Sequence, residues 1–328
     1  MTQRDPMEPP PTARNQAADA PQPLPQTVAL LRANLSRDYV DPDFWRGLGR
    51  VLRSQAEATA AMAQRRLDGA SPTDPDGMDI ELIALVLPFL VLLYRGWWRV
   101  TAEGLDHVPG EGRALLVANH SGVVPWDGAM IATAVLAEHP APRVVRNLYL
   151  RGAATLPFVA PAFAAFGQVQ ARPENALRLL EADQLVGVFP EGLNGVGKLF
   201  KDRYKLARFG HGGFVRTALR TGAPLIPVAV IGAEETYPML ANARLIARLC
   251  GIPYFPVTPL FPWFGLLGVV PLPSKWTIVF HERIPTAEYG PAGADDPQLV
   301  AALAGQVRDR IQATIDAKLA ARTSVFLG

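Results

Sequence analysis

The stretch that decides the fold is ALLVANHSGVVPWDG, residues 114–128, in which five apolar residues lead into a polar loop. A run that is apolar at every position is typical of a strand buried on both faces of a sheet. Four similar runs follow along the chain, over residues 144–150, 185–189, 225–231 and 276–280. The sequence therefore predicts a sheet that contains these strands and is covered on both faces.

Stretches with helical character separate most of these runs, over residues 128–138, 174–182, 212–220 and 239–249. Strands that alternate with helices predict an α/β fold, with a mostly parallel, twisted sheet flanked by helices. A last helix is predicted from Pro297, with Asp296 as its N-cap. Its apolar residues recur every four positions from Leu299 to Leu319, and we expect this face to pack on the sheet.

The chain before this α/β domain, which we assign to residues 100–328, divides by composition. Residues 1–26 hold seven prolines and almost no large apolar side chains, so they predict a disordered tail. Residues 27–78 carry apolar residues at helical spacing and predict a helical appendage that ends in the linker SPTDPDG. The N-terminus shows no signal peptide, so we expect the chain to stay on the cytoplasmic side.

Two apolar segments predict contact with lipid. Residues 79–99 contain the uncharged run Leu82–Tyr94 followed by Trp97 and Trp98. A helix of that length extends about 20 Å, short of the ~30 Å hydrocarbon core, so we expect it in the membrane interface, where indole rings concentrate. A buried core helix is the alternative. Residues 251–273 carry no charge and six prolines, which predicts an apolar loop at the interface or, alternatively, a buried hairpin.

Composition narrows the possible functions. With 32 Lys and Arg against 30 Asp and Glu, the net charge of +2 argues against a nucleic-acid partner. Hydrophobic residues make up 49% and charged residues 19%, below the roughly 25% typical of soluble domains, which indicates lipid contact or a large core. The single cysteine, Cys250, excludes a disulfide framework, and we expect it to be buried. The histidines show no ligand spacing, so no metal site is predicted.

His120 and Asp127 are the first candidate site residues. His120 lies where the strand at 114–118 ends, and Asp127 lies where the next helix begins. An imidazole can accept a proton at neutral pH, and a carboxylate bonded to its other nitrogen stabilises the imidazolium. The pair therefore matches a general-base dyad. On these residues alone a structural role, with Asp127 as a helix N-cap, is the stronger alternative.

The segment LVGVFPEGLNGVGK, residues 185–198, is a second buried strand with a polar tip, here Glu191 and Gly192. From Gly192 to Lys198 it satisfies the G-x-x-x-x-G-K opening of a phosphate-binding P-loop. However, Leu199 stands where a P-loop needs Ser or Thr to meet Mg²⁺, and Glu191 places an acid directly before the loop. A nucleotide site is therefore not predicted.

A basic segment follows that tip. Between Val196 and Arg220 there are seven positive residues and one negative residue, a local charge of +6. Such a concentration suits a phosphate, a phospholipid headgroup or the phosphates of coenzyme A, with Lys198 and Lys205 as candidate ligands. A solvated helix face is the alternative. Arg172, just before the helix predicted at 174–182, is a further cation at the strand ends.

Together these stretches resemble the four blocks of the glycerolipid acyltransferase superfamily, in their order and approximate spacing. The matching segments are NHSGVVPWDG at residues 119–128, the region of Arg172, VFPEG at 188–192 and PLIPVA at 224–229. The chain looks most like the 1-acyl-glycerol-3-phosphate acyltransferases and their lysophospholipid and diacylglycerol acyltransferase-like relatives. The resemblance covers roughly residues 100–285.

The resemblance implies transfer of a fatty acyl group from acyl-CoA or acyl carrier protein to a hydroxyl of a glycerolipid, without a cofactor. It assigns the general base to His120 and its orienting partner to Asp127. Acceptor binding falls to Glu191 and Gly192, with Arg172 near the acceptor phosphate. The expected partners are the lipid bilayer, the acyl donor and a glycerolipid such as a lysophospholipid, at the cytoplasmic face of the inner membrane.

One departure from the family pattern concerns spacing. The usual block is His-x4-Asp, whereas six residues separate His120 from Asp127. This indicates a divergent branch and leaves a neutral alcohol open as the acceptor. The alternative to an enzyme is a non-catalytic module of the same scaffold that binds lipid or acyl-CoA.

Overall fold

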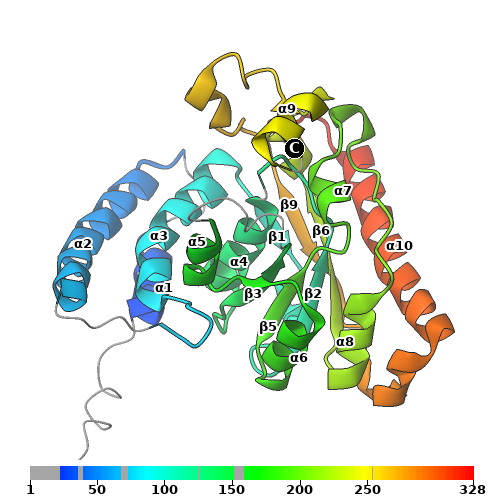
Figure 1. The fold of residues 1–328 in the computed structure, drawn as a ribbon. Coiled ribbons are helices and arrows are strands. Elements are labelled where there is room, and N and C mark those ends of the chain that lie inside the picture. Colours follow the sequence, from blue (N-terminus) through cyan, green and yellow to red (C-terminus); the bar gives the residue numbers. More distant parts are fainter. Residues whose placement is uncertain (1–22, 36–39, 68–72, 125, 151–158, 253) are drawn as a thin grey trace, which may run out of the picture.

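A seven-stranded sheet with helices on both faces forms the centre of the molecule (Figure 1). The computed structural model describes residues 23–35, 40–67, 73–124, 126–150, 159–252 and 254–328. The strands, in order across the sheet, are β1 (Thr101–Glu103), β9 (Thr277–Phe280), β6 (Leu225–Ile231), β2 (Ala114–Ala118), β5 (Leu185–Val188), β3 (Val145–Tyr149) and β4 (Val169–Gln170). From β6 to β4 the strands run parallel, whereas β9 is antiparallel to β6. The predicted α/β fold with a mostly parallel sheet is confirmed.

The five predicted strands all form, and their ends shift by one residue at most. Every residue of β2 and β6 is buried, because helices cover both faces of the sheet at its centre. The sequence analysis missed β1 and β4, which have three and two residues. Strands this short contain too few residues to display an apolar pattern.

Four helices cover the two faces of the sheet. On one face α6 (Pro173–Glu181), α8 (Gly213–Thr221) and α10 (Pro297–Ala321) share a core cluster with β2, β5 and β6. On the other face α4 (Trp126–Glu138) packs in a second cluster with the same strands. Each central strand thus contributes alternate side chains to two cores, as its uniformly apolar sequence predicts.

The C-terminal helix α10 agrees with its prediction in detail. The Asp296 side chain caps the helix by accepting hydrogen bonds from the backbone N–H groups of Gln298 at 2.8 Å and Leu299 at 3.2 Å. The predicted apolar stripe faces the sheet, and its buried members are Leu303, Val307, Ile311 and Ile315. This face is therefore a packing surface.

The helix predicted over residues 239–249 is shorter than expected. Helix α9 begins only at Arg244 and runs to Cys250, because the residues before it form β7 (Ala241–Asn242), which pairs with β8 (Pro256–Val257). The prediction that Cys250 is buried is wrong, since its side chain is exposed. The reason is that α9 buries only one of its seven residues.

The N-terminal helices form a layer beside α4 (Figure 1). They are α1 (Pro23–Asn34), α2 (Pro42–Leu67) and α3 (Ile80–Leu92), with the short α5 (Val159–Ala165) adjoining α3. Of the predicted disordered tail, residues 1–22 lie outside the described residues. Residues 23–26 were placed in that tail wrongly. They form the first turn of α1 because Leu24 is buried in the cluster that joins the three helices.

Helix α3 combines a buried and an exposed side. It continues through a π-helical turn, Leu93–Trp97, and the stretch Ile80–Trp97 is long and apolar enough to cross a membrane by length and composition. One third of that stretch, 33%, is buried inside the protein, where Leu87 and Val91 pack against the N-terminal helices. Phe89 on the opposite side is exposed. The segment is therefore partly a core helix, and its contact with lipid stays a prediction.

The paired tryptophans at the end of this segment have different surroundings. Trp97 is exposed, whereas Trp98 is completely buried and stacks on Trp276 with ring centroids 4.8 Å apart. Trp97 ends the π-helical turn and Trp98 follows it, so the two side chains leave the backbone in different directions. The expectation that both rings reach the membrane interface is wrong for Trp98.

We predict that Trp98→Ala lowers the free energy of unfolding by about 3–5 kcal/mol, because it removes a large buried ring. The matched variant Trp97→Ala should cost about 1 kcal/mol or less, since that ring is exposed and loses one hydrogen bond, from Nε1–H to the Pro271 carbonyl. Urea unfolding of both variants measures the difference. Similar small losses in the two would contradict this assignment of the core.

Candidate active site

His120 follows the central strand β2 and is held from two sides. Its backbone N–H donates to Glu191 Oε1 at 3.0 Å, which ties it to the loop after β5. The preceding residue, Asn119, fixes it to β6, because the Asn119 side chain accepts from the Val230 N–H at 2.7 Å and donates to the Val230 carbonyl at 2.9 Å. The histidine therefore stands at a rigid point where the carboxyl ends of three adjacent strands meet.

The imidazole of His120 is hydrogen-bonded to Asp127, in the first turn of α4. The distance from His120 Nδ1 to Asp127 Oδ2 is 2.8 Å, and the Asp127 side chain is completely buried. Asp127 also accepts hydrogen bonds from the backbone N–H groups of Ser121 at 2.9 Å and Gly128 at 2.8 Å. An ionised carboxylate only accepts hydrogen bonds, so this contact suits the neutral imidazole that carries its hydrogen on Nδ1 and a lone pair on Nε2. This tautomer is the one that a general base requires.

The wider spacing between His120 and Asp127 does not separate them. Residues 121–124 form a loop, α4 begins at Trp126, and the Asp127 carboxylate still reaches the ring at hydrogen-bond distance. Asp127 also lies within α4, so it is not the residue that precedes the helix as an N-cap would. The geometry thus fits the dyad. Asp127 also has a structural role, because it accepts from two backbone N–H groups, and the catalytic role stays a prediction.

Phe189, from the segment VFPEG, fixes the imidazole on one face. Its ring stacks on that of His120 with centroids 4.5 Å apart and an interplanar angle of 30°. The His120 side chain is still partly exposed, at 15%. An imidazole bonded at one nitrogen and stacked on one face has little freedom to rotate, so Nε2 is held in a constant direction.

Glu191 was predicted to bind an acceptor, and in the structure its carboxylate binds other parts of the protein. Its side chain is buried; Oε1 accepts from His120, and Oε2 accepts from the backbone N–H of Ala207 at 2.6 Å. Gly192, the next residue, has a φ of +54°, in the region that favours glycine, and leads into the short helix α7 (Leu193–Val196). The carboxylate therefore joins β2, β5 and the segment before α8 at one point.

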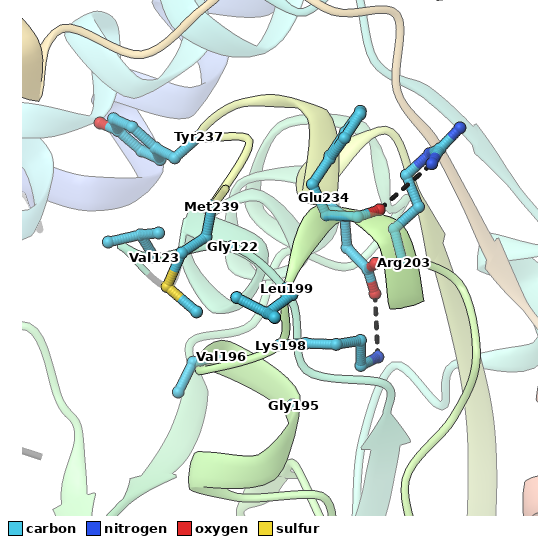
Figure 2. Close-up of a pocket in the computed structure, with 11 residues that line it drawn as sticks. Gly122, Val123, Gly195, Val196, Lys198, Leu199, Arg203, Glu234, Tyr237 and Met239 are labelled. Carbon is cyan, nitrogen blue, oxygen red and sulfur yellow. Dashed lines mark hydrogen bonds and ion pairs between the residues drawn. The ribbon is translucent and has the colours of Figure 1, made fainter. Parts of the chain in front are cut away.

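Lys198 likewise forms internal ion pairs. Its ammonium lies 3.1 Å from Glu234 Oε1 and 3.4 Å from Glu191 Oε2, and Figure 2 shows the side chain directed at Glu234. Glu234, which follows β6, also accepts from the Tyr204 N–H at 2.6 Å. Burial raises the pKa of Glu234 to about 7, although the Lys198 charge opposes this shift. Lys198 therefore has protein carboxylates as partners, while its contact with a phosphate stays a prediction.

The other predicted cations lie apart from this cluster. Arg172 precedes α6 and is exposed, and Lys205 is also exposed. Part of the basic segment has structural partners, since Arg216 donates to the Ala294 carbonyl at 2.6 Å and Arg220 pairs with Asp295 at 3.5 Å. Among the described residues, the structure joins His120, Asp127, Glu191 and Lys198 in one site but does not bring Arg172 or Lys205 into contact with them.

Four residues of this site have no individual role assigned from the sequence, namely Asn119, Phe189, Gly195 and Glu234, although Asn119 and Phe189 lie in the quoted motifs. Asn119 and Glu234 form the contacts described above, and Gly195 packs directly under the histidine. A Cβ built at Gly195 would lie 2.6 Å from the His120 carbonyl oxygen, so only glycine fits there. For Gly195, the available signal was that three of the seven residues in EGLNGVG, 191–197, are glycines. The partners of Asn119 and Glu234 are far away in sequence and become visible only when the strands are placed side by side.

A family model described as Acyltransferase matches residues 99–231, which include β2, β3, β4, β5, β6 and the His120–Asp127 pair. The chain is 48% identical over 278 residues to an uncharacterized protein of Mycobacterium tuberculosis, covering 84% of this chain and 78% of that protein. A similar protein of Mycobacterium leprae is 47% identical, covering 84% and 76%.

Two more distant similarities carry functional descriptions. A Bos taurus protein described as a DGAT1/2-independent enzyme synthesizing storage lipids is 24% identical over 226 residues, which is 67% of this chain and 60% of that protein. The crystal structure of the 1-acyl-sn-glycerophosphate acyltransferase PlsC from Thermotoga maritima matches with a TM-score of 0.46 and 18% identity. That match covers 73% of this chain and 82% of the other.

We predict that Glu234 makes stability depend on pH. A carboxyl whose pKa rises from 4.5 to about 7 on folding stabilises the protein below pH 4.5, and this contribution is lost as the pH rises through 7. The free energy of unfolding of the wild type, relative to Glu234→Gln, should therefore fall by on the order of 3 kcal/mol over that range. Urea unfolding at several pH values measures it.

The control for this experiment is Glu288→Gln, which changes an exposed carboxyl. Its stability should follow that of the wild type at every pH. Parallel pH profiles for the wild type and Glu234→Gln would show that the buried Glu234 carboxyl does not titrate as described.

Proposed function

The chain belongs to the glycerolipid acyltransferase superfamily, and on this premise we propose that it transfers a fatty acyl group from acyl-CoA or acyl carrier protein to a glycerolipid hydroxyl. The observation that carries the proposal is the 2.8 Å hydrogen bond between His120 Nδ1 and the buried Asp127 carboxylate. That bond leaves Nε2 as an oriented base at the carboxyl end of the sheet, where α/β proteins hold their ligands.

The reaction needs a base because a lipid alcohol is a poor nucleophile. His120 Nε2 removes the hydroxyl proton as the alcohol oxygen attacks the thioester carbonyl. The tetrahedral intermediate then collapses, the C–S bond breaks, and the imidazolium returns the proton to the departing thiolate. The products are the ester and the free thiol of the carrier. A placed base of this kind contributes about 10²–10⁴-fold to the rate.

Asp127 supports this step without exchanging a proton. Its buried carboxylate holds His120 in the required tautomer and stabilises the positive charge that forms on the ring. Phe189 keeps the ring from turning. The proposed reaction involves neither a metal ion nor a covalent acyl-enzyme.

We assign the remaining site residues to two roles. Glu191 and Lys198 are positioning residues, because their charged groups bind other parts of the protein and hold the loop that carries His120. Arg172 and Lys205 are exposed cations, and Gly192 lies at the loop tip, so these three are our candidates for contact with the phosphates of the donor or the acceptor. The acceptor class includes lysophospholipids and neutral glycerides.

Both proposed substrates carry acyl chains, so we place the enzyme at a membrane, on its cytoplasmic face. The apolar stretch Ile80–Trp97 and the exposed Trp97 support membrane contact. Acyl-CoA reaches the site from water, whereas the acceptor lipid reaches it from the bilayer. The site therefore has to be open to water and to lipid.

We predict that His120→Ala lowers the turnover of acyl-CoA with lysophospholipid or diacylglycerol acceptors by about 10²–10⁴-fold, because the proton acceptor is removed. Mass spectrometry of the lipid products measures this. The control is His211→Ala, which changes an exposed histidine. Unchanged turnover in His120→Ala would remove the mechanism. A wild type that binds acyl-CoA but acylates no acceptor would instead favour the non-catalytic module.

We also predict that Gly195→Ala reduces acyl transfer by roughly 10²-fold, because the added Cβ, 2.6 Å from the His120 carbonyl oxygen, displaces the base. Gly213→Ala is the matched control, since a Cβ at Gly213 meets nothing within 4 Å. Product formation by both variants, with their unfolding curves, gives the comparison. Full activity in Gly195→Ala would show that the position of His120 is not critical.

A further inference from the structure

Helix α9 and the loop after β8 expose large apolar side chains that the fold does not use. The most exposed are Leu249 at 79%, Leu245 at 71%, Trp263 at 71% and Leu267 at 69%, and Ile246 and Phe264 are exposed with them. We call these six residues the α9 face. Only Ala247 of α9 is buried, so the helix has almost no contact with the core. The pairing of β7 with β8 brings the starts of these two segments together, and exposed apolar side chains on neighbouring segments mark a surface that meets a partner.

The charge on this segment identifies the partner. Between Met239 and Ser274 the only charged residues are Arg244 and Arg248, both exposed on α9. The two arginines are one helical turn apart, so they lie on the same side of α9. A short helix with leucines and basic residues but no acid, followed along the chain by a loop with an exposed tryptophan, matches a surface that lies in the headgroup region of an anionic bilayer.

A second copy of the chain fits this surface less well. A twofold contact through the α9 face would bring the same patch from both copies together. The four arginines of the two copies would then lie within one largely apolar contact, and the segment offers no carboxylate to pair with them. Anionic lipid headgroups supply the missing negative charge and also accept the leucine and tryptophan side chains.

The α9 face adjoins the proposed active site. Tyr254 Oη donates a hydrogen bond to the Val123 carbonyl at 2.6 Å, which ties the segment after α9 to the loop between His120 and Asp127. The loop after β8 is also joined to the π-helical turn that follows α3, because Trp97 Nε1–H donates to the Pro271 carbonyl at 3.0 Å. Figure 1 shows α9 and the gold segment after it at the end of the sheet where α7 lies.

From these observations we propose that the α9 face docks the protein onto an anionic lipid surface, through Leu245, Leu249 and Trp263 in the apolar layer and Arg244 and Arg248 at the headgroups. The docking itself needs no catalysis. The consequence that the His120 site opens toward the lipid rests on the proposed function. A separate surface would then hold the catalytic domain at the bilayer, in addition to any contact made by α3.

Cosedimentation with vesicles of phosphatidylcholine, with and without phosphatidylglycerol, tests this proposal. The wild type should bind the anionic vesicles and lose binding at high salt. Arg244→Gln combined with Arg248→Gln should weaken binding by about 30-fold, since each basic residue near an anionic surface contributes roughly fivefold. Leu249→Ser combined with Trp263→Ser should weaken it at least tenfold on the same vesicles, because apolar burial is lost.

The matched control is Trp45→Ser combined with Leu52→Ser on α2, where the two side chains are 53% and 54% exposed. This variant should bind as the wild type does. Loss of binding in the α2 variant alone would overturn the proposal and place docking on the N-terminal layer. A change of oligomeric state in Leu249→Ser with Trp263→Ser, with vesicle binding intact, would overturn it in favour of a second copy.

Acyl transfer in detergent micelles, measured on the same variants, separates this proposal from the proposed function. An inactive wild type that binds vesicles through the α9 face refutes the function and leaves the docking intact. Active enzymes that bind vesicles equally well with and without the α9 substitutions refute the docking and leave the function intact.

Discussion

The organisation of this protein depends on one buried carboxylate, that of Asp127, which accepts hydrogen bonds from an imidazole and two backbone N–H groups. A charge without solvent is costly unless it is fully hydrogen-bonded, so the loop that supplies those donors must keep its shape. The constraint runs in both directions: the loop satisfies Asp127, and Asp127 orients His120. The family pattern has four residues between the histidine and the aspartate, and this chain has six. The longer segment still brings Asp127 into hydrogen-bond contact with His120.

A second buried charge cluster fixes the other side of the site. Glu191 joins the loop after β2 to the segment before α8, and Lys198 joins Glu191 to Glu234 after β6. Such a network stabilises little on balance, because desolvation offsets the attraction between its members. Its value lies in geometry, since removal of any one member leaves its partners unsatisfied. Glu191 and Lys198, which resemble substrate ligands in sequence, thus bind other parts of the protein, and the role we propose for them is to position His120.

The sequence predicts the sheet because β2 and β6 are apolar at every position, and it predicts α10 because Asp296 and Pro297 mark its start. It does not reveal pairings that depend on tertiary structure, such as Lys198 with Glu234 or Asn119 with Val230. Nor does it show that Trp97 is exposed and Trp98 buried, because two adjacent tryptophans give no sign of which one faces the core. The motif containing His120 and Asp127 was visible, yet the structure was needed to show that the two side chains meet.

In the reaction that we propose, His120 Nε2 takes the proton from the acceptor hydroxyl while the donor thioester lies beside it. The most direct measurement is a crystal structure of the protein with a non-hydrolysable acyl-CoA analogue and a glycerolipid acceptor. The account predicts an acceptor hydroxyl within about 3 Å of His120 Nε2, pointing at the carbonyl that replaces the thioester. An acceptor hydroxyl or donor carbonyl bound at another edge of the sheet, out of reach of His120, would contradict it.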